Sequence, residues 1–162
     1  MLEGIHKIHL IGIGGSGMRA IANILIQKGY EVSGSDVKES DVIERFRKMG
    51  ATVHIGHNAD YVQGVDAVVR STAIREDNPE IVAAKEQGIT ILHRSDIVKA
   101  VLDVTNGIAV AGAHGKTSTT SMIGQILVEG QMEPTVIIGG EVDYLKGSSC
   151  LGTVSYTHLT LP

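Results

Sequence analysis

The sequence predicts an α/β protein built on a doubly wound parallel sheet. Short apolar runs, each a candidate strand, alternate along the chain with segments whose apolar residues recur at helical spacing. Two glycine-rich loops, at residues 12–17 and 112–118, each follow such a run and open a candidate helix. With 162 residues, 43% of them hydrophobic, the chain is long enough to bury a core without disulfides. Strands and helices that alternate in this way favour a parallel sheet covered by helices.

The first strand, loop and helix occupy residues 7–29. The apolar run 7–12 ends in Gly12-Ile13-Gly14-Gly15-Ser16-Gly17, which satisfies the G-x-G-x-x-G pattern, and a helix is expected over 18–29. Asp36 ends the next strand, 31–36, about 20 residues further on, where this motif needs a ribose-binding acid. The loop therefore predicts a ligand with a pyrophosphate and a ribose. A nicotinamide or flavin dinucleotide is the default ligand for this motif, but a sugar nucleotide has the same pyrophosphate and ribose, and the loop alone does not separate the two.

The alternation continues to about residue 102, and a polar break follows at residues 103–107. The sequence therefore predicts a Rossmann-like domain over residues 1–104. The remaining expected elements are helices over 41–49, 79–87 and 95–102 and strands over 52–55, 66–71 and 89–92.

The pattern restarts after the break, with a strand over 107–112, the second glycine loop, a helix over 117–127 and a strand over 135–138. In Gly115-Lys116-Thr117 the lysine can reach phosphates and the threonine hydroxyl can bind Mg²⁺. The loop departs from the full Walker A pattern because Val110 stands where that pattern has a glycine. Residues 105–152 thus read as the beginning of a P-loop ATPase-type α/β domain, and residues 153–162 stay unassigned.

Charge and composition argue against several classes of partner. The 14 basic and 18 acidic residues give a net charge of −4, and the basic residues are scattered, so nucleic acid is not an expected partner. No apolar run approaches the roughly 20 residues of a membrane span. Cys150 is the single cysteine, which favours a reducing compartment. We expect a cytoplasmic protein without membrane or nucleic-acid contacts.

Taken together, these motifs resemble the amino-terminal part of the Mur ligase family over about residues 5–150. The series is specific because the motifs occur in the family's order. It consists of Gly12-Ile13-Gly14-Gly15-Ser16-Gly17-Met18, Ser33-Gly34-Ser35-Asp36, Gly56-His57, Ser71-Thr72-Ala73-Ile74 with Asn78-Pro79-Glu80, and Ala111-Gly112-Ala113-His114-Gly115-Lys116-Thr117-Ser118-Thr119-Thr120.

The resemblance implies an ATP-dependent ligase that joins L-alanine to UDP-N-acetylmuramate in peptidoglycan precursor synthesis, with Mg²⁺ as cofactor. It assigns Lys116 to the transferring phosphate, as the catalytic residue, and Thr117 to Mg²⁺. Carried over by position, the residues facing the UDP sugar are Gly14, Gly15, Ser16, Gly17, Ser35, Asp36, His57, Ser71 and Thr72, and those facing ATP are Gly112, Ala113, His114, Gly115, Lys116, Thr117 and Ser118.

Two departures from the family pattern qualify this expectation. Ala113 stands where threonine is frequent, and the family continues with a second Mg²⁺ ligand, the rest of the ATPase domain and a third domain, so we expect no ligase activity from this chain alone. Three alternatives remain open: a sister ligase that recycles a muropeptide onto the same sugar nucleotide, an NAD(P)-binding Rossmann module, and a sugar-nucleotide binder without catalysis.

Overall fold

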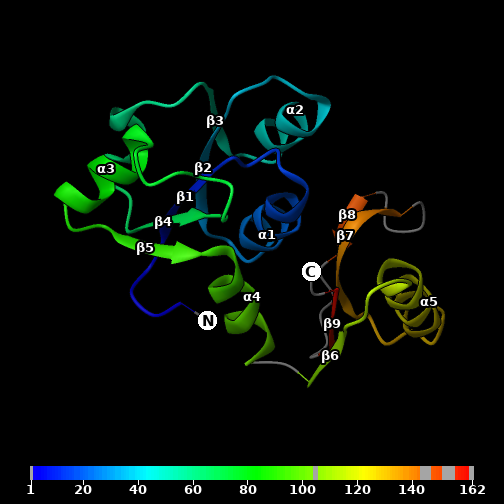
Figure 1. Ribbon diagram of the computed structural model, residues 1–162. Helices are drawn as coiled ribbons and strands as arrows, with labels where there is room; N and C mark the ends of the chain where they lie inside the picture. Colours follow the sequence, from blue (N-terminus) through cyan, green and yellow to red (C-terminus); the bar gives the residue numbers. More distant parts are fainter. Residues whose placement is uncertain (1, 104–105, 143–146, 151–155, 161–162) are drawn as a thin grey trace. The chain divides into compact units, whose positions relative to one another are not determined.

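The computed structural model describes residues 2–103, 106–142, 147–150 and 156–160. The chain forms two compact units, Leu2–Ile97 and Val98–Pro162. The division falls inside the helix α4, Arg94–Leu102, a few residues before the polar break (Figure 1). The domain boundary expected at 104/105 stays a prediction.

The first unit contains the predicted parallel sheet. Its strand order is β3-β2-β1-β4-β5, and every neighbouring pair is parallel. Because all five strands run the same way, their carboxyl ends meet at one edge of the sheet. The α/β class and the doubly wound order are thus confirmed. The strands are β1 Lys7–Ile11, β2 Glu31–Asp36, β3 Thr52–Ile55, β4 Ala67–Arg70 and β5 Thr90–His93.

Helices cover both faces of this sheet (Figure 1). The helices α1 (Ser16–Gln27) and α2 (Asp41–Lys48) connect β1, β2 and β3, whereas η1 (Ala59–Val62) and α3 (Pro79–Glu86) precede β4 and β5. Right-handed crossovers that run in opposite directions from β1 place the two pairs on opposite faces. Side chains cap three of these helices: Ser40 at α2, Asn58 at η1 and Asn78 at α3 each accept a hydrogen bond from a backbone N–H of the first turn.

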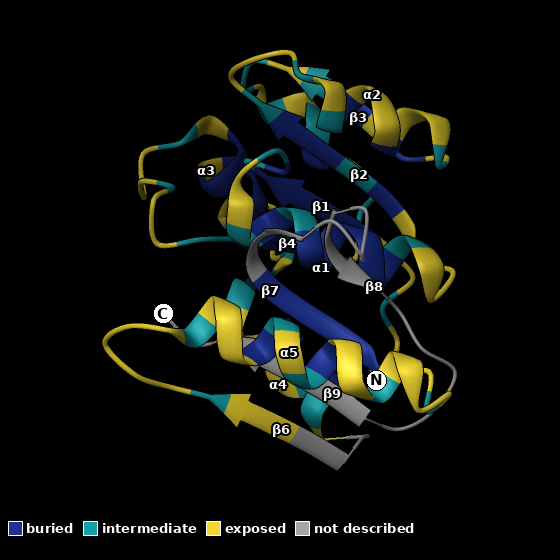
Figure 2. Ribbon diagram, turned by 90° about the vertical axis from the view of Figure 1, so that its right-hand side faces the viewer, coloured by how far each residue is buried: buried dark blue, intermediate teal, exposed yellow. Residues whose placement is uncertain are grey.

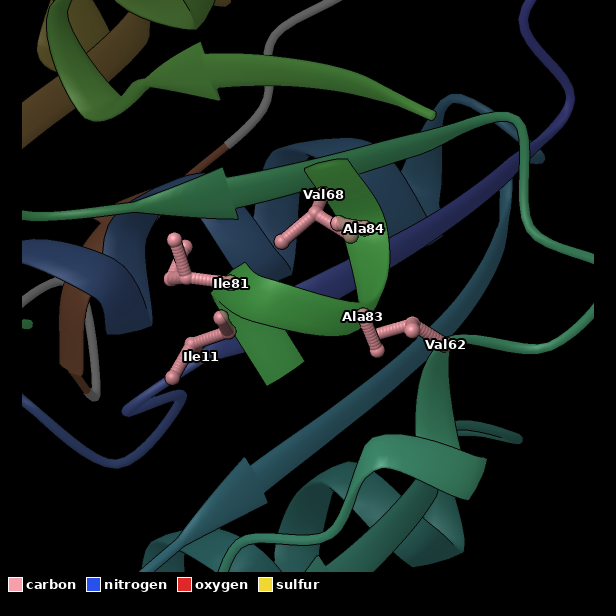
Figure 3. Packing of buried hydrophobic residues seen from close by; sticks show 6 residues of the cluster. All are labelled: Ile11, Val62, Val68, Ile81, Ala83 and Ala84. Carbon is pink, nitrogen blue, oxygen red and sulfur yellow. The ribbon is translucent and has the colours of Figure 1, made fainter. Parts of the chain in front are cut away.

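The apolar side chains of α3 pack against the sheet in one of the buried clusters of this unit (Figure 3). Figure 2 shows the same division along each element, with β1 almost entirely buried and α2 exposed on its outer side. Ile81 is a fully buried member of the cluster, whereas its neighbour Val82 is 39% exposed. The cluster consists of Ile11, Val62, Val68, Ile81, Ala83 and Ala84.

A buried carboxylate at the start of α3 contacts residues of β1, of β2 and of the turn after β3. Glu80 is fully buried, and its Oε2 accepts a hydrogen bond from Ser35 Oγ at 2.7 Å. Its Oε1 lies 3.3 Å from His57 Nδ1 and accepts from the backbone N–H of Asn58 at 3.3 Å. His9 Nε2 lies 3.4 Å from Oε2, close enough for an electrostatic contact but without hydrogen-bond geometry. We call these five residues the Glu80 network.

The Glu80 network stabilises the ionised form of its carboxyl group. Burial raises the pKa of Glu80, but the contacts with His9 and Ser35, together with the charges of His9 and His57, outweigh burial and leave the pKa below its ordinary value of 4.5. His9 is held in turn by Ser33, whose Oγ lies 2.9 Å from Nδ1. The network fixes the end of β2 and the turn after β3 against α3.

The second unit holds a four-stranded sheet in the order β6-β9-β7-β8. Its helix α5 (Lys116–Glu129) packs against β7 and β9, and its buried residues Thr120 and Gly124 lie one turn apart. The stretches before Cys150 and inside 153–162, for which the sequence predicts no strand, form β8 and β9. Among the described residues no helix is both long and apolar enough to cross a membrane. The strands are β6 Asn106–Val110, β7 Thr135–Val142, β8 Gly147–Cys150 and β9 Tyr156–Thr160.

Truncating Ile81 to alanine tests the packing of α3 on the sheet. We expect the free energy of unfolding to fall by about 2–5 kcal/mol, because the substitution leaves a cavity in a fully packed cluster. Val82→Ala, on the exposed side of the same helix, should change it by less than about 0.5 kcal/mol. Urea denaturation followed by circular dichroism measures both, and equal losses for the two variants would contradict the packing described here.

Replacing Glu80 by glutamine tests the buried carboxylate. Because the folded-state pKa lies below 4.5, ionised Glu80 contributes stability above that pH, and the contribution is lost as the pH falls through the lowered value. We expect E80Q to be less stable than the parent by about 1–3 kcal/mol at neutral pH and less dependent on pH in the acid range.

Urea denaturation at a series of pH values makes the comparison. Glu86→Gln is the matched control, since Glu86 lies exposed on the same helix, and it should keep the pH dependence of the parent. If E80Q loses stability in acid as steeply as the parent does, Glu80 is not the group responsible.

Candidate functional site

A pocket opens at the carboxyl edge of the first sheet. It has a volume of about 460 Å³ and lies where the chain leaves β1, β2, β4 and β5. In an open parallel sheet the ligand crevice forms where the strand order turns back, here between β1 and β4. The lining consists of Gly12, Gly14, Gly15, Ser16, Gly17, Met18, Asp36, Ser71, Thr72, Ala73, Ile74 and Arg94.

The first glycine loop is fastened to the end of β2. The backbone N–H groups of Gly12 and Ile13 both donate to the carbonyl of Ser35, at 2.8 and 3.0 Å. The next N–H, of Gly14, donates to Asp36 Oδ2 at 2.8 Å. Asp36 therefore holds the loop in shape with one carboxylate oxygen while it lines the pocket.

The start of α1 keeps its donors free. The N–H groups of Ser16 and Gly17 have no acceptor among the described residues, and the N-cap Gly15 provides no side chain to cap them. Unpaired N–H groups at the positive end of a helix dipole bind an oxyanion. This end of the pocket is therefore suited to a phosphate.

The structure brings most of the expected sugar-nucleotide residues together. Gly14, Gly15, Ser16, Gly17, Asp36, Ser71 and Thr72 all line the pocket. Ser35 and His57 do not line it: Ser35 is fully buried, and both side chains belong to the Glu80 network. Whether these two contact a ligand stays a prediction, but in this structure they position the turns that border the pocket.

Sequence reasoning missed Arg94. It follows β5 directly, and its side chain lies across Gly17, so that a Cβ added at Gly17 would come within 1.8 Å of Arg94 Nη1. Its guanidinium has no hydrogen bond or ion pair within the described part of the chain. The signal was present in the sequence: Arg94 stands just past the end of one strand, as Ser71 does past β4.

The second glycine loop forms the start of α5. Gly115 is the N-cap, with φ of +76°, a conformation that residues with a side chain rarely adopt. The loop from Gly112 to Gly115 is exposed, and Lys116 Nζ donates to the carbonyl of Gly112 at 2.7 Å. The ammonium therefore lies over the loop that precedes its own helix.

The backbone donors at this helix start are suited to a phosphate. The described residues offer no acceptor to the N–H groups of Lys116, Thr117 and Ser118, and no side chain caps the helix. The Thr117 hydroxyl also has no recorded partner among them, and it is exposed, so it is free to bind a cation such as Mg²⁺. Of the other expected residues, Ala113, His114 and Ser118 are exposed beside it.

Comparison with known proteins identifies the family. The model of the Mur ligase family, catalytic domain, matches residues 7–105, more than half of the chain. A UDP-N-acetylmuramate–L-alanine ligase from Desulfatibacillum aliphaticivorans is 46% identical over 91% of this chain and 32% of its own length. One from a Sulfurihydrogenibium species is 47% identical over 91% of this chain and 33% of its own length. The chain thus spans about a third of these curated relatives.

Solved structures agree with the family assignment. The UDP-N-acetylmuramate–alanine ligase of Thermotoga maritima superimposes with a TM-score of 0.88 at 35% identity, covering 95% of this chain and 37% of that one. A UDP-N-acetylmuramate:L-alanyl-γ-D-glutamyl-meso-diaminopimelate ligase from Neisseria meningitides reaches the same TM-score at 26% identity, covering 97% and 52%. The chain belongs to the Mur ligase family.

Proposed function

We propose that this chain is the amino-terminal part of an ATP-dependent ligase that forms the amide bond between L-alanine and UDP-N-acetylmuramate. In this proposal the pocket of the first unit binds the UDP sugar and the α5 start binds ATP. One observation carries the proposal: this member of the family has two helices that have a glycine as N-cap and free N–H donors in the first turn. Two such sites suit a reaction with two phosphorylated substrates.

The contents of the pocket support a sugar nucleotide. The free N–H donors at the start of α1, the carboxylate of Asp36, and the hydroxyls of Ser71 and Thr72, which follow β4, all line the pocket. Phosphates, a ribose and a sugar offer matching acceptors and hydroxyls. Asp36 retains acceptor capacity for ribose hydroxyls, because its Oδ2 takes one hydrogen bond from Gly14 and its Oδ1 only a long one from Lys38 N.

The proposed reaction needs charge stabilisation more than covalent chemistry. A carboxylate oxygen of the sugar nucleotide attacks the γ-phosphorus of ATP, and the bond to the bridging oxygen breaks to release ADP. The amine of L-alanine then attacks the acyl phosphate carbon and displaces phosphate. Lys116 would neutralise the transferring phosphoryl group by exchanging its contact with the Gly112 carbonyl for one with phosphate. Thr117 would hold Mg²⁺, which neutralises the same oxygens when bound.

The muropeptide-recycling ligase is the second candidate, because its solved structures superimpose as well as the alanine ligase does, with TM-scores of 0.88. Sequence separates the two. Identity to the recycling enzymes is 26–27%, whereas relatives named as L-alanine ligases reach 43–47%. We therefore favour L-alanine over a peptide as the acceptor that the complete protein uses.

Titration calorimetry of this chain with UDP-N-acetylmuramate and with NADH tests the ligand of the first unit. We expect saturable one-to-one binding of the sugar nucleotide and none of NADH. Asp36→Asn should weaken sugar-nucleotide binding about tenfold, since a neutral amide is a poorer acceptor for the Gly14 N–H and for ribose hydroxyls. NADH binding without sugar-nucleotide binding would refute the proposal.

Lys116→Ala tests the division of labour between the two units. We expect affinity for ATP with Mg²⁺ to fall about 10- to 100-fold, the worth of a charge-assisted contact, while affinity for UDP-N-acetylmuramate stays unchanged. Lys99→Ala, at an exposed lysine of α4, removes the same charge as a control and should alter neither. Equal losses for both ligands in Lys116→Ala would contradict separate sites.

A further inference from the structure

We propose that Arg94 is a diphosphate ligand of the first unit, and that it fixes the direction in which a nucleotide lies in the pocket. This inference rests on the proposed function, since it concerns the same pocket. It concerns a residue that the G-x-G-x-x-G motif does not include. The geometry points to this role through three observations: the guanidinium lies beside Gly17, it has no acceptor within the described part of the chain, and the backbone of Arg94 is held by its neighbours.

The position of the side chain is the first observation. The Arg94 side chain lies against the backbone of Gly17: a Cβ there would come within 2.9 Å of Cζ and 3.2 Å of Cδ as well as within 1.8 Å of Nη1. Gly17 is in the first turn of α1, whose free N–H groups face the pocket that Arg94 also lines. A guanidinium beside unpaired N–H donors concentrates positive potential at one point.

The missing partner is the second observation. Other arginines of this unit have carboxylate partners: Arg47 with Glu39, Arg70 with Glu76, and Arg75 with Asp77. No acceptor is recorded for Arg94 within the described chain, although it is partly buried. A partly buried guanidinium has lost some of its hydration and gains most from a bidentate oxyanion. A phosphate at the α1 start would provide one.

The third observation is that the turn carrying Arg94 is fixed before any ligand binds. Asp96 Oδ2 accepts from the backbone N–H of His93 at 2.7 Å, and Ser95 Oγ lies 2.7 Å from His93 Nδ1. β5 in turn pairs with β4, with His93 opposite Arg70. The backbone of Arg94 is therefore set by its neighbours on both sides, which lowers the entropy lost when its side chain binds.

The pocket thus carries opposite charges at two different points of the glycine loop. Asp36 lies beside Gly14 and Arg94 beside Gly17, and the two side chains are not paired with each other. A nucleotide diphosphate satisfies both charged groups in one direction only, with ribose hydroxyls at Asp36 and phosphates at Arg94, because the reverse would bring phosphates against a carboxylate.

The test compares ligands that differ in their phosphates. UDP-N-acetylmuramate, UDP and uridine are titrated into this chain, R94Q and R94K. We expect R94Q to bind UDP and UDP-N-acetylmuramate about 10- to 100-fold more weakly and uridine unchanged, with R94K between R94Q and the parent. Arg75→Gln, which removes the same charge from an exposed arginine, is the control and should bind all three like the parent.

The outcomes separate this inference from the proposed function. If the parent chain does not bind UDP-N-acetylmuramate, both fail. If the parent binds it and R94Q binds it equally well, or if R94Q loses uridine as strongly as UDP, the proposed function survives and the role of Arg94 is refuted. Thermal melts of each variant show that it is folded, and R94K carries the comparison should R94Q unfold.

Gly17→Ala gives an independent check. The added methyl group must displace the guanidinium, which is the flexible end of a side chain, so we expect loss of UDP affinity with little loss of stability. If the effect passes through Arg94, the double variant G17A/R94Q binds UDP about as weakly as R94Q alone. Additive losses would mean that Gly17 and Arg94 act separately, and would refute the contact on which the inference depends.

Discussion

The helices of this protein differ in how the first backbone N–H groups of each are satisfied. A side chain caps each of α2, η1 and α3, from Ser40, Asn58 and Asn78, so one first-turn donor of each of these helices is paired with a side chain. The N-caps of α1 and α5 are instead Gly15 and Gly115, which have no side chain to cap the helix. Their free N–H groups must find an acceptor in water or in a ligand. Both glycine loops thus lack a stabilising side-chain cap and keep N–H donors that are suited to an oxyanion.

An uncapped helix start needs support from elsewhere, and the first unit provides it in two layers. The loop before α1 is fastened to β2 through the Ser35 carbonyl and the Asp36 carboxylate, which use the N–H groups of Gly12, Ile13 and Gly14. Below it, the Glu80 network holds the Ser35 side chain and the turn at His57 against α3. A buried, ionised carboxylate is costly unless it is fully hydrogen-bonded, so this part of the sheet accepts few alternative arrangements.

Much of this arrangement could be predicted from the sequence. The five strands of the first unit and the glycine loops were predictable because each depends on neighbouring residues: an apolar run, a glycine at a turn, a cap. Asp36 was predictable from its spacing to the loop. The strands β8 and β9 were not predictable. Residues 147–150 of β8 are small and mostly polar, although β8 pairs with the neighbouring strand β7, and β9 pairs with β6, about 50 residues earlier in the chain.

The candidates Ser35 and His57, which do not line the pocket, and the missed residue Arg94 have one cause in common. Ser35 and His57 stand in motif positions, but whether such a side chain faces the pocket or the interior depends on Glu80, 45 and 23 residues away from them. Arg94 escaped notice because its role depends on a glycine far back in the chain, at which only the fold places it. The spacing of glycines along the chain can predict that a loop binds an anion. The side chains around the pocket come together because the parallel strands end at one edge of the sheet. The free donors follow β1, the acid ends β2, the hydroxyls follow β4 and the guanidinium follows β5.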